Sequence, residues 1–197
     1  MAKNKEEIII PKPSIEEVED YLEKWKCNEE YCTKEKALNK LFFEICPKNT
    51  DIKDILLKAS TLNDFYSTNI FSIYPVAKHI QDKGIDSKLK KGDISVVSDI
   101  QNVTIAGKNK NFYSFASKYC SHHNPEEYPI YDSYVDRILR YFRKCDKFSD
   151  FKNEDLKDYV EFKKILLKFR DYYGLNEYSL KQIDQYIWQL GKKYFSN

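Results

Sequence analysis

The sequence predicts an all-α protein, and two observations carry that prediction. Only 5 glycines and 6 prolines occur in 197 residues, which is too few turn formers for a chain of many short strands. In addition, every strong run of apolar residues repeats with helical spacing. The chain is long enough to bury a core without disulfides or metals. We therefore expect about nine helices, packed as a single domain or as two intimate lobes, with no disulfide or metal needed.

Several local signals fix where the expected helices begin and end. Ser14 is a typical N-cap, and Glu17 would complete a capping box with it. Asp51 is expected to cap a later helix, and Gly84 to end another. The polar segment 144–153 is expected to be a surface loop. In chain order, the expected helices span about residues 14–26, 34–45, 52–62, 73–81, 93–100, 111–122, 133–142, 154–172 and 179–194.

The chain divides into a short arm and one long domain. Residues 1–13 are expected to form an extended arm, because they end in two closely spaced prolines, and residues 14–197 the all-α domain. The segment 103–111 contains a glycine among lysines and asparagines and is expected to be a turn or hairpin loop. Strands are expected at most in the short apolar runs Ile8–Ile10 and Val103–Ile105.

Composition limits the class of protein. The 33 Lys and Arg residues nearly balance the 31 Asp and Glu residues, so the formal net charge is only +2. The strong positive charge of a dedicated nucleic-acid binder is therefore absent. An evenly solvated surface is the simpler interpretation, although lysines can still gather on one face in space.

The cysteines and the N-terminus indicate a cytoplasmic protein. The five cysteines, Cys27, Cys32, Cys46, Cys120 and Cys145, include no Cys-x-x-Cys pair. Reduced, mostly packed thiols are the simplest account, and they fit a reducing compartment. No apolar run is long enough for a signal peptide or a membrane span. We expect no cofactor, no bound metal and no membrane contact; the sequence does not indicate an oligomeric state.

The segment 111–135 is the densest in residues capable of chemistry. It sets Asp132 at an expected helix N-terminus, where free backbone amides stabilise an anion. A helix N-cap is one interpretation of this residue. The other is a pocket carboxylate flanked by Tyr128, Tyr131 and Tyr134. Residue type and position favour the two about equally.

The run from Tyr128 to Phe142 resembles the segment that holds the catalytic aspartate in helix-hairpin-helix DNA glycosylases. In that superfamily an alanine of the preceding helix lies sixteen residues before the aspartate, and Ala116 stands sixteen before Asp132. The match around the aspartate begins with Tyr128, Pro129 and Ile130. It continues with Asp132, Ser133, Tyr134, Val135 and Arg137.

The resemblance implies a two-lobed helical fold and a DNA-binding protein that excises a base. Ser114 would occupy the position of the lyase lysine, which implies a monofunctional enzyme in which Asp132 stabilises a sugar cation or orients a water. Lys110 and Phe112 stand where the family's hairpin has two glycines. The contacts of this hairpin with a phosphate would therefore differ from those of the family. The iron–sulfur cluster of some members is not expected, since no cysteine follows Cys145.

The resemblance also implies a set of nucleic-acid contacts. The target base would be flipped into a pocket lined by Tyr113, His122 and Tyr131. Lys108 and Lys110 would contact phosphates, although an ordinary exposed turn accounts for them equally well.

Lys118 is a further catalytic candidate. It lies one helical turn from Ser114 and from His122. A desolvated amine there could form an imine with a sugar, but a solvent-exposed lysine is the commoner case.

Two alternatives remain open at this point. The first is a non-enzymatic helical binding module, such as a defence or mobile-element accessory protein, in which Asp132 is only a helix cap. The second is an unrelated helical enzyme that holds a metal with His122, His123, Asp132 and Glu126. Adjacent histidines point about 100° apart on a helix, so a polar helix end is the more common arrangement.

Overall fold

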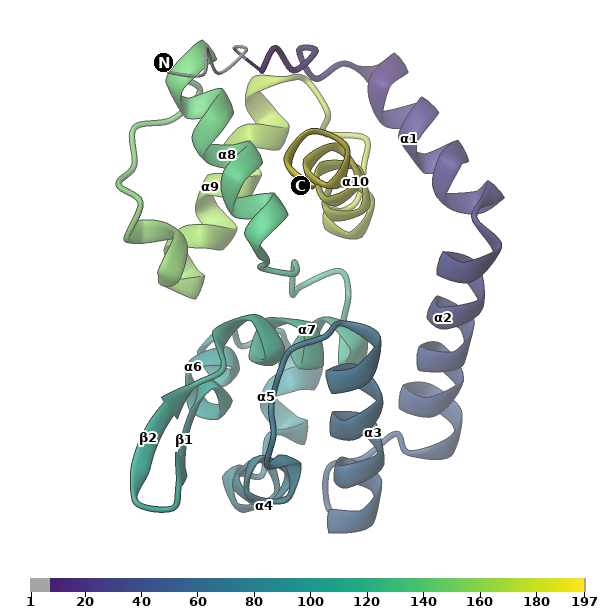
Figure 1. Ribbon diagram of the computed structural model, residues 1–197, viewed down its shortest axis with the longest axis vertical. Coiled ribbons are helices and arrows are strands. Elements are labelled where there is room, and N and C mark those ends of the chain that lie inside the picture. Colours follow the sequence, from purple (N-terminus) through teal and green to yellow (C-terminus); the bar gives the residue numbers. More distant parts are fainter. Residues whose placement is uncertain (1–7, 197) are drawn as a thin grey trace, which may run out of the picture.

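The protein is all-α, as its apolar periodicity predicts. The computed structural model describes residues 8–196, and this part of the chain contains ten α-helices and one small hairpin (Figure 1). The α-helices are α1 Ile15–Cys27, α2 Glu29–Asn39, α3 Ile52–Phe65, α4 Ile73–Lys83, α5 Asp86–Lys91, α6 Ser95–Gln101, α7 Tyr113–His123, α8 Ser133–Asp146, α9 Tyr159–Tyr172 and α10 Leu180–Phe195. A π-helical stretch, Lys40–Ile45, extends α2, and a 3-10 turn, Asp155–Lys157, precedes α9.

The hairpin lies where the sequence predicts a turn or hairpin loop. Strands β1 (Asn102–Ile105) and β2 (Lys108–Asn111) pair antiparallel, with Val103 opposite Lys110 and Ile105 opposite Lys108. Of the two apolar runs considered for strands, Val103–Ile105 is one, whereas Ile8–Ile10 is not.

Two groups of helices face each other across a gap spanned on one side by α1 and α2 (Figure 1). One lobe contains α3 to α7 and the hairpin. The other contains α8, α9 and α10, with α1 packed along α10. The segment between α7 and α8 crosses from one lobe to the other. Asp132, the aspartate singled out from the sequence, lies at the end of this connection and therefore between the lobes.

Helices α1 and α3 begin, and α4 ends, where the sequence predicts. The Ser14 hydroxyl accepts a 3.2 Å hydrogen bond from the backbone N–H of Glu17 at the start of α1. The Asp51 carboxylate accepts one of 2.8 Å from the N–H of Lys53 at the start of α3. Gly84 ends α4 with φ +58°, a left-handed conformation that favours glycine. These helix boundaries are confirmed, because each depends on neighbours in the chain. The capping box predicted for Ser14 and Glu17 is not found: Glu17 Oε2 is buried with no hydrogen-bond partner among the described residues, and the box occurs instead at Ser179 and Gln182 of α10.

Three helices differ most from the expectation. Helix α9 begins at Tyr159 rather than at residue 154, because the Asp158 side chain caps it by accepting the N–H groups of Val160 and Glu161. The second helix begins at Glu29 rather than Lys34, because the Asn28 side chain caps it by accepting the N–H of Tyr31 at 3.0 Å. Helix α5 was not predicted. It has six residues and buries only Leu89, so it offers no repeat that could show helical periodicity.

The segment predicted as a surface loop, 144–153, is only partly one. Helix α8 continues to Asp146, and both Phe148 and Phe151 are buried. Phe148 packs edge-on against Phe169 of α9, with ring centroids 5.4 Å apart. The polar residues around these two phenylalanines give the segment the composition of a surface loop, so their burial was not predicted. The expectation of a wholly exposed loop was wrong.

The arm is described only in part. Residues 1–7 of the predicted extended arm lie outside the described residues. Ile10 is buried, and its backbone N–H donates a 3.0 Å hydrogen bond to the hydroxyl of Tyr141 in α8. The last residues before α1 are therefore held against the lobe that contains α8.

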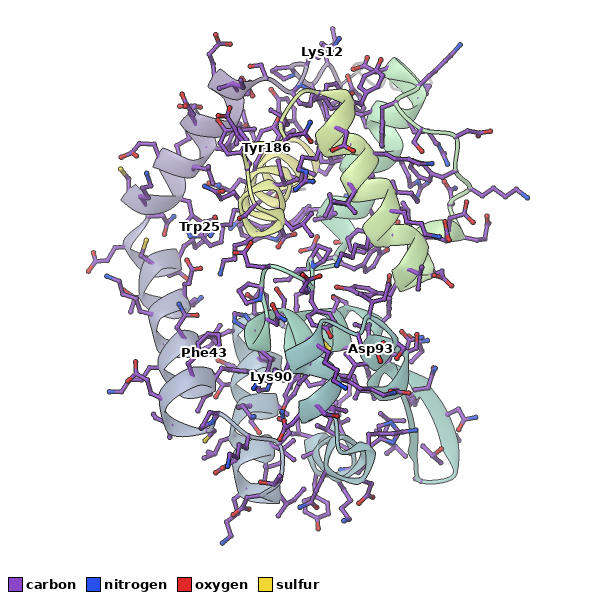
Figure 2. All side chains as sticks on the ribbon, turned by 180° about the vertical axis from the view of Figure 1, so that it is seen from behind. Lys12, Trp25, Phe43, Lys90, Asp93 and Tyr186 are labelled. Atoms are coloured by element: carbon purple, nitrogen blue, oxygen red, sulfur yellow. The ribbon has the colours of Figure 1, made fainter. Side chains whose placement is uncertain are left out.

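Gly191 lets α10 approach the start of α8 closely. A Cβ atom built there would lie 2.7 Å from Tyr134 Cβ and 2.9 Å from Tyr134 O. On the other side of α10, Tyr186, which is labelled in Figure 2, is fully buried. Its ring packs edge-on against that of Tyr21 in α1, with centroids 5.5 Å apart. Contacts on two sides thus hold α10 in place. As a result, the side chains of its first turns lie against the segment that connects the lobes.

The state of the cysteines and the character of the helices can also be compared with the sequence predictions. The five cysteines are all unpaired, as predicted. Within residues 8–196, every helix falls short of the length and apolar character that crossing a bilayer requires.

Candidate functional site

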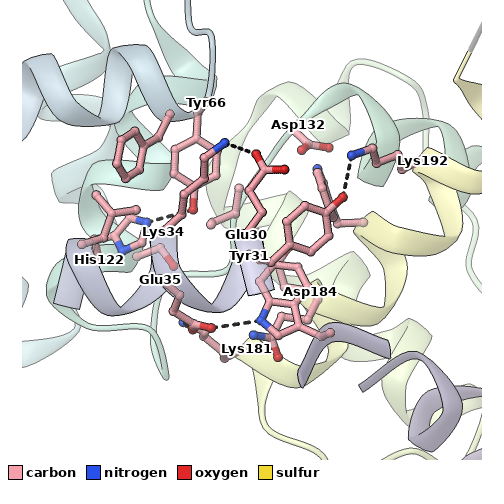
Figure 3. Close-up of a pocket in the computed structure, with 17 residues that line it drawn as sticks. Glu30, Tyr31, Lys34, Glu35, Tyr66, His122, Asp132, Lys181, Asp184 and Lys192 are labelled. Atoms are coloured by element: carbon pink, nitrogen blue, oxygen red, sulfur yellow. Dashed lines mark hydrogen bonds and ion pairs between the residues drawn. The ribbon is translucent and has the colours of Figure 1, made fainter. Parts of the chain in front are cut away.

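Two adjoining cavities lie between the lobes. The first, which we call the aromatic pocket, has a volume of about 240 Å³, and its walls include Trp25, Tyr31, Tyr66, His122 and Trp188 (Figure 3). The second, which we call the polar groove, is an open cleft of about 870 Å³. Its lining combines non-aromatic polar side chains with aromatic rings. The former are Ser67, Thr68, Asn111, Ser114, Lys118, Asp132, Ser133, Lys157 and Lys192, and the latter are Phe65, Tyr66, Phe112, Tyr113, Phe115, Tyr131, Tyr134 and Trp188.

Asp132 lies where the two cavities meet, since it lines both. It is also the N-cap of α8: its Oδ1 accepts hydrogen bonds from the backbone N–H groups of Tyr134 at 2.9 Å and Val135 at 3.0 Å. No donor among residues 8–196 binds the other oxygen, Oδ2. The cap interpretation is therefore confirmed for one oxygen, while the other is without a donor among these residues. Of the three tyrosines expected to flank the carboxylate, Tyr131 and Tyr134 line the polar groove with it, whereas Tyr128 lines neither cavity and donates instead to Asp93 O at 3.0 Å.

Lys118 is buried, with 3 % of its surface exposed, so the expectation of a solvent-exposed lysine was wrong. Its Nζ donates to Ser114 Oγ at 2.7 Å and to the backbone oxygen of Tyr131 at 3.3 Å. Burial lowers the pKa of this amine, while Asp132 and Asp184 act in the opposite direction. The cause is the position of α7, whose residues are covered both by its own lobe and by the connection to α8.

His122 and Tyr66 form a second polar contact in the wall of the aromatic pocket. The Tyr66 hydroxyl lies 2.9 Å from His122 Nε2 (Figure 3). Burial lowers the pKa of His122 to about 3, and the charges of Lys181 and Lys118 act in the same direction. The imidazole is therefore neutral at physiological pH, and the pair offers hydrogen-bonding atoms without a net charge.

His123 points away from this pocket. Its Nε2 lies 3.2 Å from Asn49 Nδ2 and 3.3 Å from Lys58 Nζ, in a polar cluster inside the lobe that contains α3 to α7. The described part of the chain contains no group of three or more His, Cys, Asp or Glu side chains that could hold a metal. The set His122, His123, Asp132 and Glu126 considered from the sequence is therefore not gathered at one point.

Tyr113, Ser114 and Tyr131 line the polar groove. The rings of Tyr113 and Tyr131 pack with centroids 4.7 Å apart. The Ser114 hydroxyl donates to the backbone oxygen of Tyr131 at 3.0 Å. The Tyr131 hydroxyl donates to Asp136 Oδ1 at 3.1 Å and itself accepts from Lys157 Nζ. Both tyrosines are thus wall residues of the groove rather than of the aromatic pocket.

The hairpin lysines lie outside both cavities. Lys108 and Lys110 are exposed on β2, and only the last residue of that strand, Asn111, reaches the polar groove. The N–H of Phe112 is bonded to Gln101 O at 2.7 Å, and that of Tyr113 to Asn111 Oδ1 at 3.0 Å. These two amides are therefore engaged within the chain and are not free to approach a phosphate.

One wall of the aromatic pocket comes from residues that the sequence did not single out. The Trp25 indole N–H donates to Glu35 Oε2 at 3.0 Å, and Glu35 also pairs with Lys181 (Figure 3). The Lys192 ammonium donates to the Tyr31 hydroxyl at 2.5 Å and lies 5.1 Å from the centre of the Trp188 ring. These residues lie near opposite ends of the chain, so no local pattern connects them.

Asp184 is the second carboxyl group of the aromatic pocket. It is 9 % exposed, and its Oδ1 is buried with no hydrogen-bond partner among the described residues. A signal was present in the sequence. Asp184 lies four residues after Leu180 and three before Ile187, which places an acid on the apolar face of α10.

The two carboxyl groups have different surroundings. Burial raises the pKa of Asp184 well above its usual range, and the negative charge of Asp132 raises it further. The positive charges of Lys118 and Lys181 and the backbone N–H of Ile130 act in the opposite direction. Asp184 therefore favours the protonated form, whereas Asp132 receives hydrogen bonds from two backbone N–H groups.

Comparison with known families and proteins gives two matches. Residues 17–127 match the family model HI_0787_N, which is described as an N-terminal domain. An uncharacterized protein of Haemophilus influenzae is 52 % identical over 148 residues, which is 75 % of this chain and 71 % of that protein. No solved structure matches this chain. The family match covers α1 to α7 and ends five residues before Asp132.

Proposed function

From the geometry of the interlobe cleft, we propose that this member of the HI_0787_N family is a DNA-binding protein that excises a base. In this activity it would be similar to the helix-hairpin-helix DNA glycosylases. The observation that carries this proposal is the position of Asp132. It lies at the junction of an aromatic pocket and an open polar groove, with one carboxylate oxygen free. A glycosylase needs this combination, because the base and the strand must be held on either side of the sugar.

The aromatic pocket suits a flipped base. Trp25, Tyr31 and Trp188 present three aromatic rings whose centroids lie 5.1 to 5.9 Å apart. Aromatic faces stack on nucleobases without regard to sequence. The Tyr66 hydroxyl and His122 supply neutral hydrogen-bonding atoms for a ring edge. These features suit a planar ligand whose edge can form hydrogen bonds.

The polar groove suits a nucleic-acid backbone. It combines hydroxyl groups with the ammonium groups of Lys118, Lys157 and Lys192. Side chains of these types make most protein contacts to phosphate and sugar. Lys108 and Lys110 are exposed on β2, of which only the last residue, Asn111, lines this groove. We keep the two lysines as candidates for further phosphate contacts.

The chemistry follows from the charges at the junction. As the bond from base to sugar breaks, positive charge develops on the sugar, and the Asp132 carboxylate stabilises it or orients a water. Lys118 is the second catalytic candidate. Its pKa is lowered by burial, so a fraction of this amine is available to attack the sugar C1′ carbon.

Asp132→Asn tests the proposal, because asparagine also caps helices well and keeps the fold. We expect the variant to lose excision of damaged or mismatched bases from duplex DNA while its unfolding temperature stays close to that of the wild type. Asp51→Asn, which changes the corresponding cap of α3 at the end remote from the cleft, is the matched control and should remain active. Excision by Asp132→Asn at the wild-type rate, or a wild-type protein with neither excision nor duplex binding at low salt, would overturn the proposal.

A non-enzymatic binding module is the second candidate function, and one observation favours it. The two hydrogen bonds to Oδ1 already give Asp132 a complete structural role as a cap. In that case the protein would bind its partner without chemistry, and Asp132→Asn would change no reaction.

A further inference from the structure

Two cysteines flank the junction at which α1 and α2 meet (Figure 1). Asn28 alone separates the two helices, and its side chain caps α2 by accepting the N–H of Tyr31 at 3.0 Å. Cys27 is the residue before this cap, and Cys32 is the fourth residue of the helix that follows it. Side chains at these two positions of a helix start frequently pack against each other. The sequence thus places two thiols in a pair of positions that local helix geometry brings together.

The thiol of Cys32 lies against the last turn of α1. Its Sγ is 3.4 Å from the backbone oxygens of both Trp25 and Lys26. The Lys26 oxygen belongs to the peptide bond that leads into Cys27, so the Cys32 sulfur lies beside the Cys27 backbone. Cys27 is exposed, and its own Sγ has only a long contact of 3.7 Å with Glu23 Oε1. The Cys27 side chain can therefore change rotamer and turn its sulfur toward the junction.

The remaining cysteines are placed differently. Cys46 and Cys120 are buried, and burial raises the pKa of both thiols. Buried thiols of this kind are inert toward reagents in solution. Cys145 is exposed in the last turn of α8, but no cysteine precedes or follows it by one helical turn. Cys27 and Cys32 thus combine an accessible thiol with a second thiol close by in the chain.

The residues around this pair form one wall of the aromatic pocket. Trp25 and Tyr31 both line the pocket, and the centroids of their rings lie 5.1 Å apart. Leu38 is the single buried residue of α2. A helix with so little buried surface opens at a low cost in free energy. A covalent bond at the start of α2 would therefore change how firmly this wall is held.

We propose that Cys27 and Cys32 form a reversible disulfide, which ties the end of α1 to the first turns of α2 and restrains this wall of the aromatic pocket. The oxidant is a low-molecular-weight disulfide. The Cys27 thiolate attacks one of its sulfurs, which forms a mixed disulfide and releases one thiolate. The Cys32 thiolate then attacks the Cys27 sulfur and releases the other. Each released thiolate takes up the proton that one cysteine lost, so the oxidant is reduced to a pair of thiols.

Oxidised glutathione tests the bond on the unmodified chain. After digestion without reductant, mass spectrometry should find that the peptide with Cys27 and Cys32 has lost both thiol hydrogens and carries no glutathione. Cys145 is the internal control, because an isolated exposed thiol stops at the mixed disulfide and should keep a glutathione adduct. In Cys32→Ser, whose hydroxyl can replace the thiol as a donor, Cys27 should keep the adduct as well. An adduct that stays on Cys27 of the wild type would overturn the proposal.

Hydrogen exchange tests the effect on the pocket wall. In the oxidised protein, the amides in the first turns of α2 should exchange at least about 3-fold more slowly than in the reduced protein. Cys27→Ser, treated with the same oxidant, is the matched control and should show no slowing. Disulfide formation without slower exchange in α2 would overturn the restraint of the wall. Neither measurement involves base excision, so a failure of the proposed function would leave this inference intact.

Discussion

The ammonium of Lys118 donates a 2.7 Å hydrogen bond to the hydroxyl of Ser114, one turn earlier in α7. If the proposed resemblance to the glycosylases holds, Ser114 would occupy the position of the lyase lysine. The bond brings the amine of the next turn to that position. The absence of a lysine at residue 114 therefore does not remove an amine from the cleft.

The first prediction concerns imine formation by Lys118. Borohydride should trap a covalent complex between the wild-type protein and DNA that carries an abasic site, and Lys118→Met should abolish it because the nucleophile is gone. Methionine has a similar length and suits the buried position. Lys53→Met, which removes an exposed ammonium at the start of α3 outside both cavities, should still be trapped. Trapping that persists in Lys118→Met would rule out this amine.

The second prediction separates the two roles of Asp132. Asp132→Ala removes the acceptor of both cap hydrogen bonds and should lower the free energy of unfolding by ~1 kcal/mol. Asp132→Asn should lower it far less, because asparagine remains a good cap. Urea denaturation of the two variants measures this difference. Equal stability of the alanine variant and the wild type would mean that the cap contributes nothing.

The third prediction concerns the close approach of α8 and α10. Gly191→Ala introduces a Cβ at 2.7 Å from Tyr134 Cβ and should destabilise the protein by about 1–3 kcal/mol, because neither helix can move away freely. Lys193→Ala, at an exposed position of the same helix, is the control and should change stability little. Thermal denaturation of both variants gives the comparison. A neutral Gly191→Ala would show that the helices can separate.

The fourth prediction is a loss of stability in acid caused by buried histidines. His122 has a pKa of about 3 in the folded protein against 6.5 ordinarily, so between these values the unfolded chain binds more protons than the folded one. Stability from His122 is complete above about pH 6.5 and is lost on acidification at up to about 1.4 kcal/mol per pH unit. His123 acts in the same direction. Urea denaturation between about pH 7 and pH 5 should show a shallower dependence for His122→Gln; an unchanged slope would contradict the assignment.

The fifth prediction concerns the salt dependence of DNA binding. Lys157 and Lys192 line the polar groove, so each lysine that contacts a phosphate should contribute about 0.9 to the slope of log K against log salt. Replacing both by methionine should weaken binding to all duplexes alike and reduce that slope. Lys108→Met and Lys110→Met measure the hairpin contribution in the same titration. A slope unaffected by any of the four would place the DNA elsewhere.

The sequence by itself determined the local features. It predicted the helical class, the Ser14 and Asp51 caps, the stop at Gly84 and the position of Asp132 at a helix start, and the structure confirms these. Each depends on residues within a few positions of one another, so a single stretch of chain contains all the interactions that decide it. The short α5 and the buried Phe148 were missed because they carry no repeating pattern.

The tertiary structure alone decided the site. Whether Lys118 is solvated, and whether Asp184 shares a cavity with Asp132, depends on how α7, α8 and α10 meet. The aromatic wall joins Trp25 to Trp188 across most of the chain, with ring centroids 5.9 Å apart. Burial changes the protonation and reactivity of a side chain, and burial is a property of the packed molecule. The sequence therefore indicated one acid, and only the packing provided the second acid and the buried amine beside it.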